Sequence, residues 1–208
     1  MSRPTEPLVV GLTGQSGAGK STVAEGLRAM AGVRCLDMDR IYRELTAAGQ
    51  PLIAEIAAAF SDAVVRADGS LDRRALAAAA FATPESAERL NAVTHPAVLR
   101  ETARRLRALA AEPDVRAVLL DAPLLFESGL DRHCDRIIAV VAPEEMRLDR
   151  IRRRDGLPEE AVRQRFLRQR SDDFYTDRAD MVLDTGGAQQ LSALIGQAKR
   201  QLEEWCDR

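Results

Sequence analysis

A glycine-rich segment near the N-terminus constrains the fold of this chain more than any other feature. Residues 14–22 read Gly-Gln-Ser-Gly-Ala-Gly-Lys-Ser-Thr and match every specified position of the phosphate-binding pattern G-x-x-x-x-G-K-[ST]. An apolar run over residues 8–13 precedes the segment, and Val23, Leu27 and Met30 follow it at helical spacing. This order predicts a buried strand, a phosphate-binding loop and a helix, which is the context that the pattern requires.

The residue types of this loop suit a nucleoside triphosphate. Successive backbone N–H groups can point inward at phosphate oxygens, and the helix N-terminus adds a partial positive charge. We expect Lys20 to reach the β and γ phosphates and the Ser21 hydroxyl to bind Mg²⁺. Of the 30 basic residues only Lys20 and Lys199 are lysine, so one of them stands where a compact ammonium is needed. The alternative to phosphate binding is that this segment is an ordinary glycine-rich turn between a strand and a helix.

Length and composition narrow the class of protein. A chain of 208 residues suggests one main domain with insertions. The net charge of −2 gives no electrostatic surface for general nucleic-acid binding. No apolar run approaches the ~20 residues of a membrane span, and residues 1–7 lack the apolar core of a signal peptide, so we expect a cytoplasmic location and no membrane partner. Cys35, Cys134 and Cys206 are odd in number and far apart, which predicts reduced, buried thiols.

Two carboxylates follow a second predicted strand, residues 33–37. The strand leads into Asp37-Met38-Asp39. If strand geometry continues through Asp39, both carboxylates point to the same side of the sheet edge, in the crevice where parallel α/β sheets bind ligands. The alternative is that Asp39 only caps a helix that begins near Arg40.

Further apolar runs complete the pattern of a doubly wound sheet. Strands are predicted over residues 115–121, 136–141 and 180–184. Asp121 ends the first of these, the usual place in this class for a carboxylate that supports Mg²⁺. The alternation of strands and helices predicts an α/β fold in three layers, with a parallel sheet between helices.

Two helical stretches do not fit simple crossovers. Residues 41–111 are alanine-rich and helical, too long for one crossover helix, so we expect a helical insertion that holds the second substrate. Farther on, Arg147, Arg150 and Arg154 fall on one helical stripe, and a break at residues 156–158 predicts a hairpin with the next arginine-rich helix. Such a mobile hairpin can place cations over phosphates, although for most of these arginines a solvated face balanced by glutamates is the better interpretation.

The phosphate-binding loop alone allows a GTPase, an ATPase motor or a small-molecule kinase. A GTPase needs the guanine-reading sequence N-K-x-D, and the single asparagine, Asn91, is followed by alanine. The sequence therefore excludes that class.

The remaining motifs, taken in order, resemble the dephospho-CoA kinase family over nearly the whole chain. Beyond the loop, the resemblance rests on Gly11-Leu12-Thr13-Gly14, Asp37-Met38-Asp39-Arg40 with Arg43, Asp68-Gly69-Ser70-Leu71-Asp72-Arg73-Arg74 with Leu76 and Phe81, His95-Pro96, Ala122-Pro123-Leu124-Leu125-Phe126-Glu127, Arg150, Arg154-Asp155, Gln169 and Ala179-Asp180. The family phosphorylates the ribose 3′-hydroxyl of dephospho-coenzyme A with ATP.

The resemblance implies a P-loop kinase fold in three parts. Residues 1–42, 113–142 and 179–208 would form the nucleotide-binding core, residues 43–112 the CoA-binding insertion, and residues 143–178 the lid. ATP phosphates would contact Gly17, Ala18, Gly19, Lys20, Ser21, Thr22, Arg150 and Arg154, with Mg²⁺ held by Ser21 and Asp121. The acceptor side would comprise Asp39, Arg73, His95, Leu124, Leu125 and Glu127. The catalytic set would be Lys20, Arg150 and Asp39, with Asp39 facing the acceptor hydroxyl.

Two functional alternatives and three departures from the family pattern stay open. Another P-loop kinase acting on nucleosides or nucleotides, or an ATP-binding regulator without turnover, would carry the same loop. His95 before Pro96 is equally compatible with a capping or core histidine. The family usually has glycine where Gln15 stands, a lid glutamine is replaced by Arg147, and an asparagine near the last strand is replaced by Asp184. The sequence leaves the oligomeric state open and allows a monomer.

Overall fold

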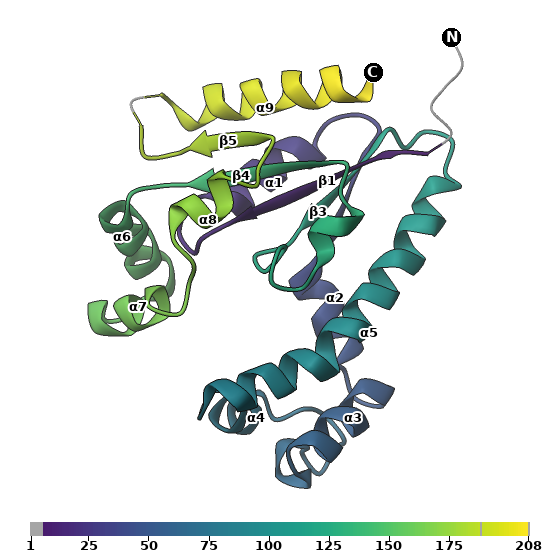
Figure 1. Cartoon of the computed structure of the whole chain (residues 1–208), viewed down its shortest axis with the longest axis vertical. Helices are drawn as coiled ribbons and strands as arrows, with labels where there is room; N and C mark the ends of the chain where they lie inside the picture. Colours follow the sequence, from purple (N-terminus) through teal and green to yellow (C-terminus); the bar gives the residue numbers. More distant parts are fainter. Residues whose placement is uncertain (1–5, 188, 208) are drawn as a thin grey trace. The chain divides into compact units, whose positions relative to one another are not determined.

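The computed structural model describes residues 6–187 and 189–207. At its centre is a five-stranded parallel sheet with the order β2-β3-β1-β4-β5 (Figure 1). The strands are β1 (Leu8–Gly14), β2 (Val33–Asp37), β3 (Ala117–Asp121), β4 (Arg136–Val141) and β5 (Met181–Asp184). Each predicted strand is present, with its ends within two residues of those expected from the apolar runs.

The strand order determines where the phosphate-binding loop lies in the sheet. β1 lies between β3 and β4, with Leu12 opposite Asp121 on one side and Ile138 on the other. The chain builds β2 and β3 on one side of β1 and then crosses to build β4 and β5 on the other. The loop after β1 therefore lies at the topological switch point, where parallel α/β sheets bind ligands.

Helices cover the sheet in a three-layer α/β arrangement. α1 (Lys20–Arg28) and α9 (Leu191–Cys206) contact each other, and their apolar faces share one buried core with β1, β4 and β5. On β1, Val10 and Leu12 enter this core, whereas Gly11 faces Leu125 and Cys134 on the opposite side. On α9, Leu194, Ala198 and Leu202 belong to this core.

The arginine-rich hairpin is present as predicted. It consists of α6 (Glu144–Asp155) and α7 (Glu159–Phe166), which contact each other around a small core of Leu148, Ile151, Val162 and Phe166. Gly156 caps the end of α6, at the predicted break. α8 (Asp172–Thr176) follows and contacts β4.

The segment Asp37–Ala108 forms a compact unit of its own, separate from the unit that contains the rest of the chain. Its helices are α2 (Met38–Leu45), α3 (Pro51–Ala59), α4 (Arg73–Ala80) and α5 (Pro84–Ala110), with a short 3₁₀ turn at Asp62–Val64. A small apolar core joins them: Leu52, Ile56, Val64, Leu71, Leu76, Ala80 and Ala97. The alanine-rich stretch is therefore helical, as its composition predicts.

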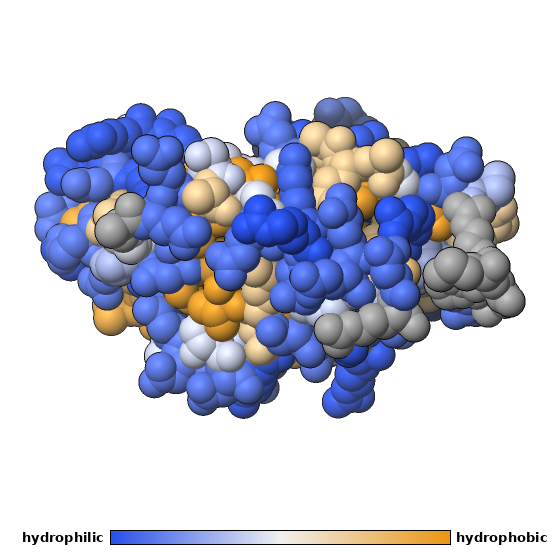
Figure 2. All heavy atoms as spheres, turned by 90° about the horizontal axis from the view of Figure 1, so that it is seen from above, coloured by the Kyte–Doolittle hydropathy of each residue, from blue (hydrophilic) through white to orange (hydrophobic). Residues whose placement is uncertain are grey.

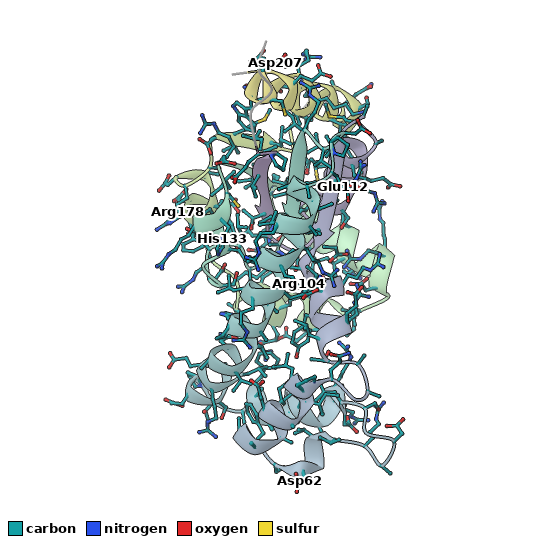
Figure 3. All side chains as sticks on the ribbon, turned by 90° about the vertical axis from the view of Figure 1, so that its right-hand side faces the viewer. Asp62, Arg104, Glu112, His133, Arg178 and Asp207 are labelled. Atoms are coloured by element: carbon teal, nitrogen blue, oxygen red, sulfur yellow. The ribbon has the colours of Figure 1, made fainter. Side chains whose placement is uncertain are left out.

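Charged and polar residues dominate one face of the molecule. Figure 2 shows hydrophilic residues over most of the face in view, with apolar residues in separate small areas. No helix of the described residues is long and apolar enough to span a membrane. Cys35, Cys134 and Cys206 are free thiols, as expected, but each is partly rather than fully buried. Asp207 at the end of α9 pairs with Arg116 at 2.8 Å (Figure 3).

Candidate active site

The phosphate-binding loop has a positive φ at three glycines, Gly14, Gly17 and Gly19, and at the first two a side chain would also clash with neighbouring backbone. Gly14 has a φ of 146° and lies so close to the Val140 carbonyl that a Cβ would overlap it. Gly17 has a φ of 82°, and a Cβ there would lie 2.7 Å from the carbonyl oxygen of Arg147. These glycines let the loop curl tightly between β1 and α1 and pack closely against α6.

The N-terminus of α1 is open toward the loop. Its cap residue is Gly19, and no side chain caps the helix. In the parts of the chain that the structure describes, the N–H groups of Gly17, Gly19, Lys20 and Ser21 have no hydrogen-bond acceptor. A helix start with open N–H groups is a ready site for phosphate. The predicted function of the loop therefore has the backbone geometry that it needs.

Lys20 and Asp121 form an ion pair next to the loop. Lys20 begins α1 and Asp121 ends β3, the strand beside β1. Their side chains are only 13% and 15% exposed, respectively. The sheet register thus brings the predicted phosphate ligand and the predicted Mg²⁺-supporting carboxylate into direct contact. The Ser21 side chain is exposed on the first turn of the same helix.

Arg150 of α6 reaches the loop from the α6–α7 hairpin, the predicted lid. Its guanidinium donates to the Gly17 carbonyl at 3.3 Å, to the Thr185 hydroxyl at 2.8 Å and to the Thr185 carbonyl at 2.9 Å. Arg154, by contrast, makes a two-bond contact with the neighbouring Asp155 carboxylate, at 2.7 and 2.8 Å. Of the two lid arginines assigned to ATP, the structure brings Arg150 to the loop.

The other arginines of the α6–α7 hairpin differ in burial: one is buried, and others are solvated. Arg163 pairs with Glu144, Glu145 and Glu159, which confirms the solvated face predicted for most of them. Arg147 is only 5% exposed, and its guanidinium lies 4.4 Å from the centre of the Phe166 ring. Burial lowers the pKa of Arg147.

Two glutamines tie the segment after α7 to the start of the loop. Gln15 is 6% exposed, and its side-chain amide donates to the Arg170 carbonyl at 2.8 Å. The amide of Gln169 donates to the Ser16 hydroxyl at 3.0 Å, and its oxygen accepts from Arg147 at 3.4 Å. Gln15, a departure from the family pattern, therefore has a specific contact in this chain. The side-chain oxygen of Gln15 and Nε of Arg147 are buried without a partner among the described residues.

The alignment predicted for Asp37 and Asp39 along a strand is wrong. β2 ends at Asp37 and α2 begins at Met38, so the strand does not continue through Asp39. The helix cap is Asp37, whose carboxylate accepts the Arg40 N–H at 3.0 Å. Asp39 lies in the first turn of α2, where its exposed carboxylate takes no hydrogen bond from a described residue. The proposal that Asp39 acts only as a cap is therefore also wrong.

Besides Asp39, two of the predicted acceptor residues lie in the helical unit. Arg73 begins α4 and donates to the Thr46 hydroxyl at 3.4 Å. His95 lies within α5, half-buried, and burial lowers the pKa of its imidazole. His95 is thus held toward its neutral form, able to donate or accept a hydrogen bond.

The remaining acceptor residues follow β3. Leu124 is 53% exposed, whereas Leu125 is fully buried against Gly11, so any contribution of Leu125 is made through packing. Glu127 is partly buried, one of its carboxylate oxygens has no partner among the described residues, and burial raises its pKa. The segment therefore offers an exposed apolar side chain and an acid with a spare oxygen.

The sequence reasoning did not identify Thr185 or the contact made by Gln15. Thr185 directly follows the C-terminal end of β5, and that position was the available signal, because ligand-binding residues gather at the ends of parallel strands. Gln15 carried no such signal, since its partner lies 155 residues away along the chain.

Comparison with known proteins agrees with this geometry. A family model described as dephospho-CoA kinase matches residues 8–190. The chain belongs to the dephospho-CoA kinase family. A dephospho-CoA kinase of Deinococcus radiodurans is 45% identical over 206 residues, which cover 97% of this chain and 96% of the relative. One from Corynebacterium glutamicum is 40% identical over 201 residues, covering 97% and 98%.

Solved structures support the same fold. A crystal structure from Thermus thermophilus has a TM-score of 0.78 and 36% identity, covering 96% of this chain and 98% of that one. A dephospho-CoA kinase from Campylobacter jejuni has a TM-score of 0.68 at 22% identity, covering 96% and 97%. A shikimate kinase from Acinetobacter baumannii, with a TM-score of 0.54 at 18% identity, shares the fold. The dephospho-CoA kinase family thus uses a fold that it shares with other small-molecule kinases.

Proposed function

We propose that this chain transfers the γ-phosphoryl group of ATP to the ribose 3′-hydroxyl of dephospho-coenzyme A, the last step of coenzyme A biosynthesis. The observation that carries the proposal is the open N-terminus of α1, which no side chain caps, in a member of the dephospho-CoA kinase family. An uncapped helix start after a glycine loop binds phosphate groups, and family membership names the acceptor.

The donor side of the reaction is assigned to residues of the loop and the lid. The open N–H groups of Gly17, Gly19, Lys20 and Ser21 would hold ATP phosphates, with Ala18 and Thr22 completing the loop. Lys20 would exchange its contact with Asp121 for the β and γ phosphates, and Arg150 is already beside the Gly17 carbonyl. These cations would stabilise the charge of the transferring group, which is the main task in phosphoryl transfer. Arg154 stays a predicted phosphate ligand that would have to leave Asp155.

Residues near Lys20 fit a Mg²⁺ ion bound together with ATP. A hydroxyl on Ser21 and a carboxylate on Asp121 are hard oxygen donors, and Mg²⁺ commonly takes one or two protein oxygens plus substrate phosphates. The described residues hold no cluster of three or more His, Cys, Asp or Glu side chains that could bind a metal without the nucleotide. When bound, Mg²⁺ would neutralise charge on the phosphates.

The acceptor side is assigned to the unit Asp37–Ala108 and to the segment after β3. Asp39 would accept the proton of the ribose hydroxyl and orient it for in-line attack on the γ-phosphorus. With a loose transition state, orientation should matter more than early proton removal. Arg73, His95, Leu124 and Glu127 are proposed to contact the acceptor.

The domain boundaries are proposed on the same grounds. The separate unit Asp37–Ala108 supports a CoA-binding insertion over residues 43–112, and the α6–α7 hairpin supports a lid over residues 143–178. The core would comprise residues 1–42, 113–142 and 179–208. A cytoplasmic location and the absence of a nucleic-acid partner stay predictions from the sequence, which leaves the oligomeric state open.

One assay tests this function against its alternatives. ADP release is measured with ATP and Mg²⁺, with dephospho-coenzyme A, a nucleoside, a nucleoside monophosphate or no acceptor, and the product is identified by mass and phosphorus NMR. We expect stimulation by dephospho-coenzyme A and a 3′-phosphorylated product. Stimulation by a nucleoside or nucleotide instead would indicate another kinase, and ATP binding without any acceptor stimulation would indicate a regulator.

A further inference from the structure

Thr185 joins three segments of the nucleotide-binding unit at one buried point. It follows the last residue of β5 and is 8% exposed. Its hydroxyl donates to the Ala18 carbonyl at 2.7 Å, and the same oxygen accepts from the Arg150 guanidinium at 2.8 Å. Its backbone N–H donates to the Val141 carbonyl at 2.9 Å, which fixes it to the end of β4. The phosphate loop, the lid helix and the sheet edge therefore meet at a single hydroxyl.

The hydrogen-bond chemistry of a threonine hydroxyl makes this arrangement directional. A hydroxyl has one proton and two lone pairs. Because Arg150 can only donate, the Thr185 oxygen must accept from it and direct its own proton to a carbonyl. Of the two carbonyls within reach, that of Ala18 is nearer: its oxygen lies 2.7 Å from the hydroxyl oxygen, and that of Val141 lies 3.4 Å away.

These contacts hold carbonyl groups of the loop and leave its phosphate-binding face free. Arg150 binds the Gly17 carbonyl at 3.3 Å, and Thr185 binds the next carbonyl, that of Ala18. Carbonyls held this way limit rotation of the peptide groups on either side of Ala18. The second of these groups carries the Gly19 N–H, which is open for phosphate, whereas the Ala18 N–H donates to the Gln15 carbonyl at 3.2 Å. The same threonine holds Arg150 through its hydroxyl and its carbonyl, so the guanidinium is oriented before ATP binds.

We propose that Thr185 is a positioning residue for phosphoryl transfer, which fixes the loop at Ala18 and aims Arg150 at the bound triphosphate. The proposal rests on the proposed function for its reaction, but its structural content concerns ATP alone. Thr185 touches neither phosphate nor acceptor itself. It acts through the loop and through Arg150, and the hydroxyl is the group that performs this role.

Substitution of the hydroxyl tests the proposal. Thr185→Val keeps the shape and the backbone contacts but removes the hydrogen bonds of the hydroxyl, so kcat/KM for ATP should fall about 10- to 100-fold, the range for losing a hydrogen bond to a charged group. We expect KM for ATP to rise and kcat to fall, with KM for dephospho-coenzyme A unchanged. Thr185→Ser retains the hydroxyl and should restore kcat/KM to within about 3-fold of the original chain.

A matched control separates positioning from loss of stability. Thr94 is 5% exposed, and its hydroxyl donates to the Leu90 carbonyl within its own helix at 2.9 Å. Thr94→Val should lower the melting temperature to an extent similar to Thr185→Val while leaving kcat/KM for ATP unchanged. If both valine variants lose activity in proportion to their melting temperatures, Thr185 is merely structural and the proposal is overturned.

A double-substitution cycle identifies the route of the effect. Once Arg150→Ala has removed the guanidinium, adding Thr185→Val should cost only about 3-fold more in kcat/KM, because part of the threonine's effect passes through Arg150. Full multiplication of the two losses, or a Thr185→Ser variant no better than Thr185→Val, would contradict the proposal. Calorimetric binding of ATP to the same variants tests Thr185 even if the original chain phosphorylates an unexpected acceptor, so failure of the proposed function is recognised separately.

Discussion

The two compact units hold their candidate functional residues in different ways. Around the phosphate loop, Lys20, Arg150 and Gln15 each contact a residue that lies more than 100 positions away along the chain. In the unit Asp37–Ala108, Asp39 is exposed at a helix start, and its carboxylate takes no hydrogen bond from a described residue. The proposed donor side is therefore held by contacts of the fold, whereas the proposed acceptor side presents a carboxylate without a hydrogen-bond donor among the described residues.

This difference predicts which substitutions alter chemistry alone and which also alter structure. A side chain held by several buried contacts cannot be removed without affecting its neighbours, because they lose hydrogen-bond partners. An exposed side chain without partners can be changed at little cost in stability. Substitutions in the two units should therefore separate activity from stability to different extents.

The largest effect is expected for Lys20→Ala. Removing the ammonium should reduce ADP release at least about 10³-fold, because phosphoryl transfer depends on positioned positive charge. Stability should also change, because Asp121 would lose its ion-pair partner in a largely buried position. Lys199, the other lysine of the chain, gives the matched control, since Lys199→Ala on α9 should keep normal turnover. Substantial turnover by Lys20→Ala would contradict the loop's assigned role.

Asp39→Asn should produce a large loss of activity without a loss of stability. We expect kcat to fall about 10²- to 10⁴-fold, the usual range for a general base, with ATP affinity and melting temperature unchanged. The control is Asp62→Asn, an exposed aspartate in the same unit (Figure 3), which should retain full kcat. A normal kcat for Asp39→Asn would exclude Asp39 as the base, and a large drop in melting temperature would contradict the contrast between the units.

Gln15→Ala tests the contact between the loop and the lid. Losing the bond to the Arg170 carbonyl should lower kcat/KM for ATP about 3- to 10-fold, the effect of one buried hydrogen bond. Trypsin should also cleave faster after Arg168 and Arg170, because that segment is less firmly held. Gln164→Ala removes an exposed glutamine whose amide donates to Glu160 on α7 at 2.9 Å, and it should change neither measurement. Unchanged cleavage in Gln15→Ala would show that the contact does not hold the lid segment.

The sequence predicts the parts of this molecule that depend on local patterns. The strands, the loop and the lid hairpin follow from apolar runs, the glycine pattern and the break at residues 156–158, because each signal lies within a few neighbouring residues. The site contacts that were missed join distant residues, such as Thr185 and Ala18, which are 167 positions apart. A contact between residues so far apart leaves no periodic pattern in the sequence.

One error of prediction, and one burial that the sequence pattern did not indicate, also have physical causes. Asp39 was placed by assuming that β2 continues, but the Asp37 carboxylate binds the Arg40 N–H and starts the helix two residues earlier than expected. Arg147 was grouped with its stripe of arginines, yet contact with Phe166 and Gln169 buries it. In both cases one side-chain contact outweighs the pattern along the chain.

The pH dependence of stability should have opposite signs in the two units. Arg104 and Arg105 lower the pKa of Glu101 to about 2, so its ion pairs stabilise the native helical unit above the unfolded pKa, about 4.3. That stability is lost as pH falls from about 4 toward 2. Glu127 has its pKa raised by burial, so its contribution is present below about 4.3 and is lost as pH rises through its native pKa.

Two isosteric substitutions make this contrast measurable, and their effects are the smallest predicted. Glu101→Gln should lower the free energy of unfolding at pH 7 by about 1 kcal/mol and flatten its dependence on pH below 4. Glu127→Gln should raise it at pH 7 by less than about 1 kcal/mol, because a neutral amide replaces a partly buried charge. Denaturant titrations at pH 3, 4, 5 and 7 measure both variants. Changes of the same sign at pH 7 would show that burial of Glu127 is compensated in the native state, and the two units would then hold their carboxylates alike.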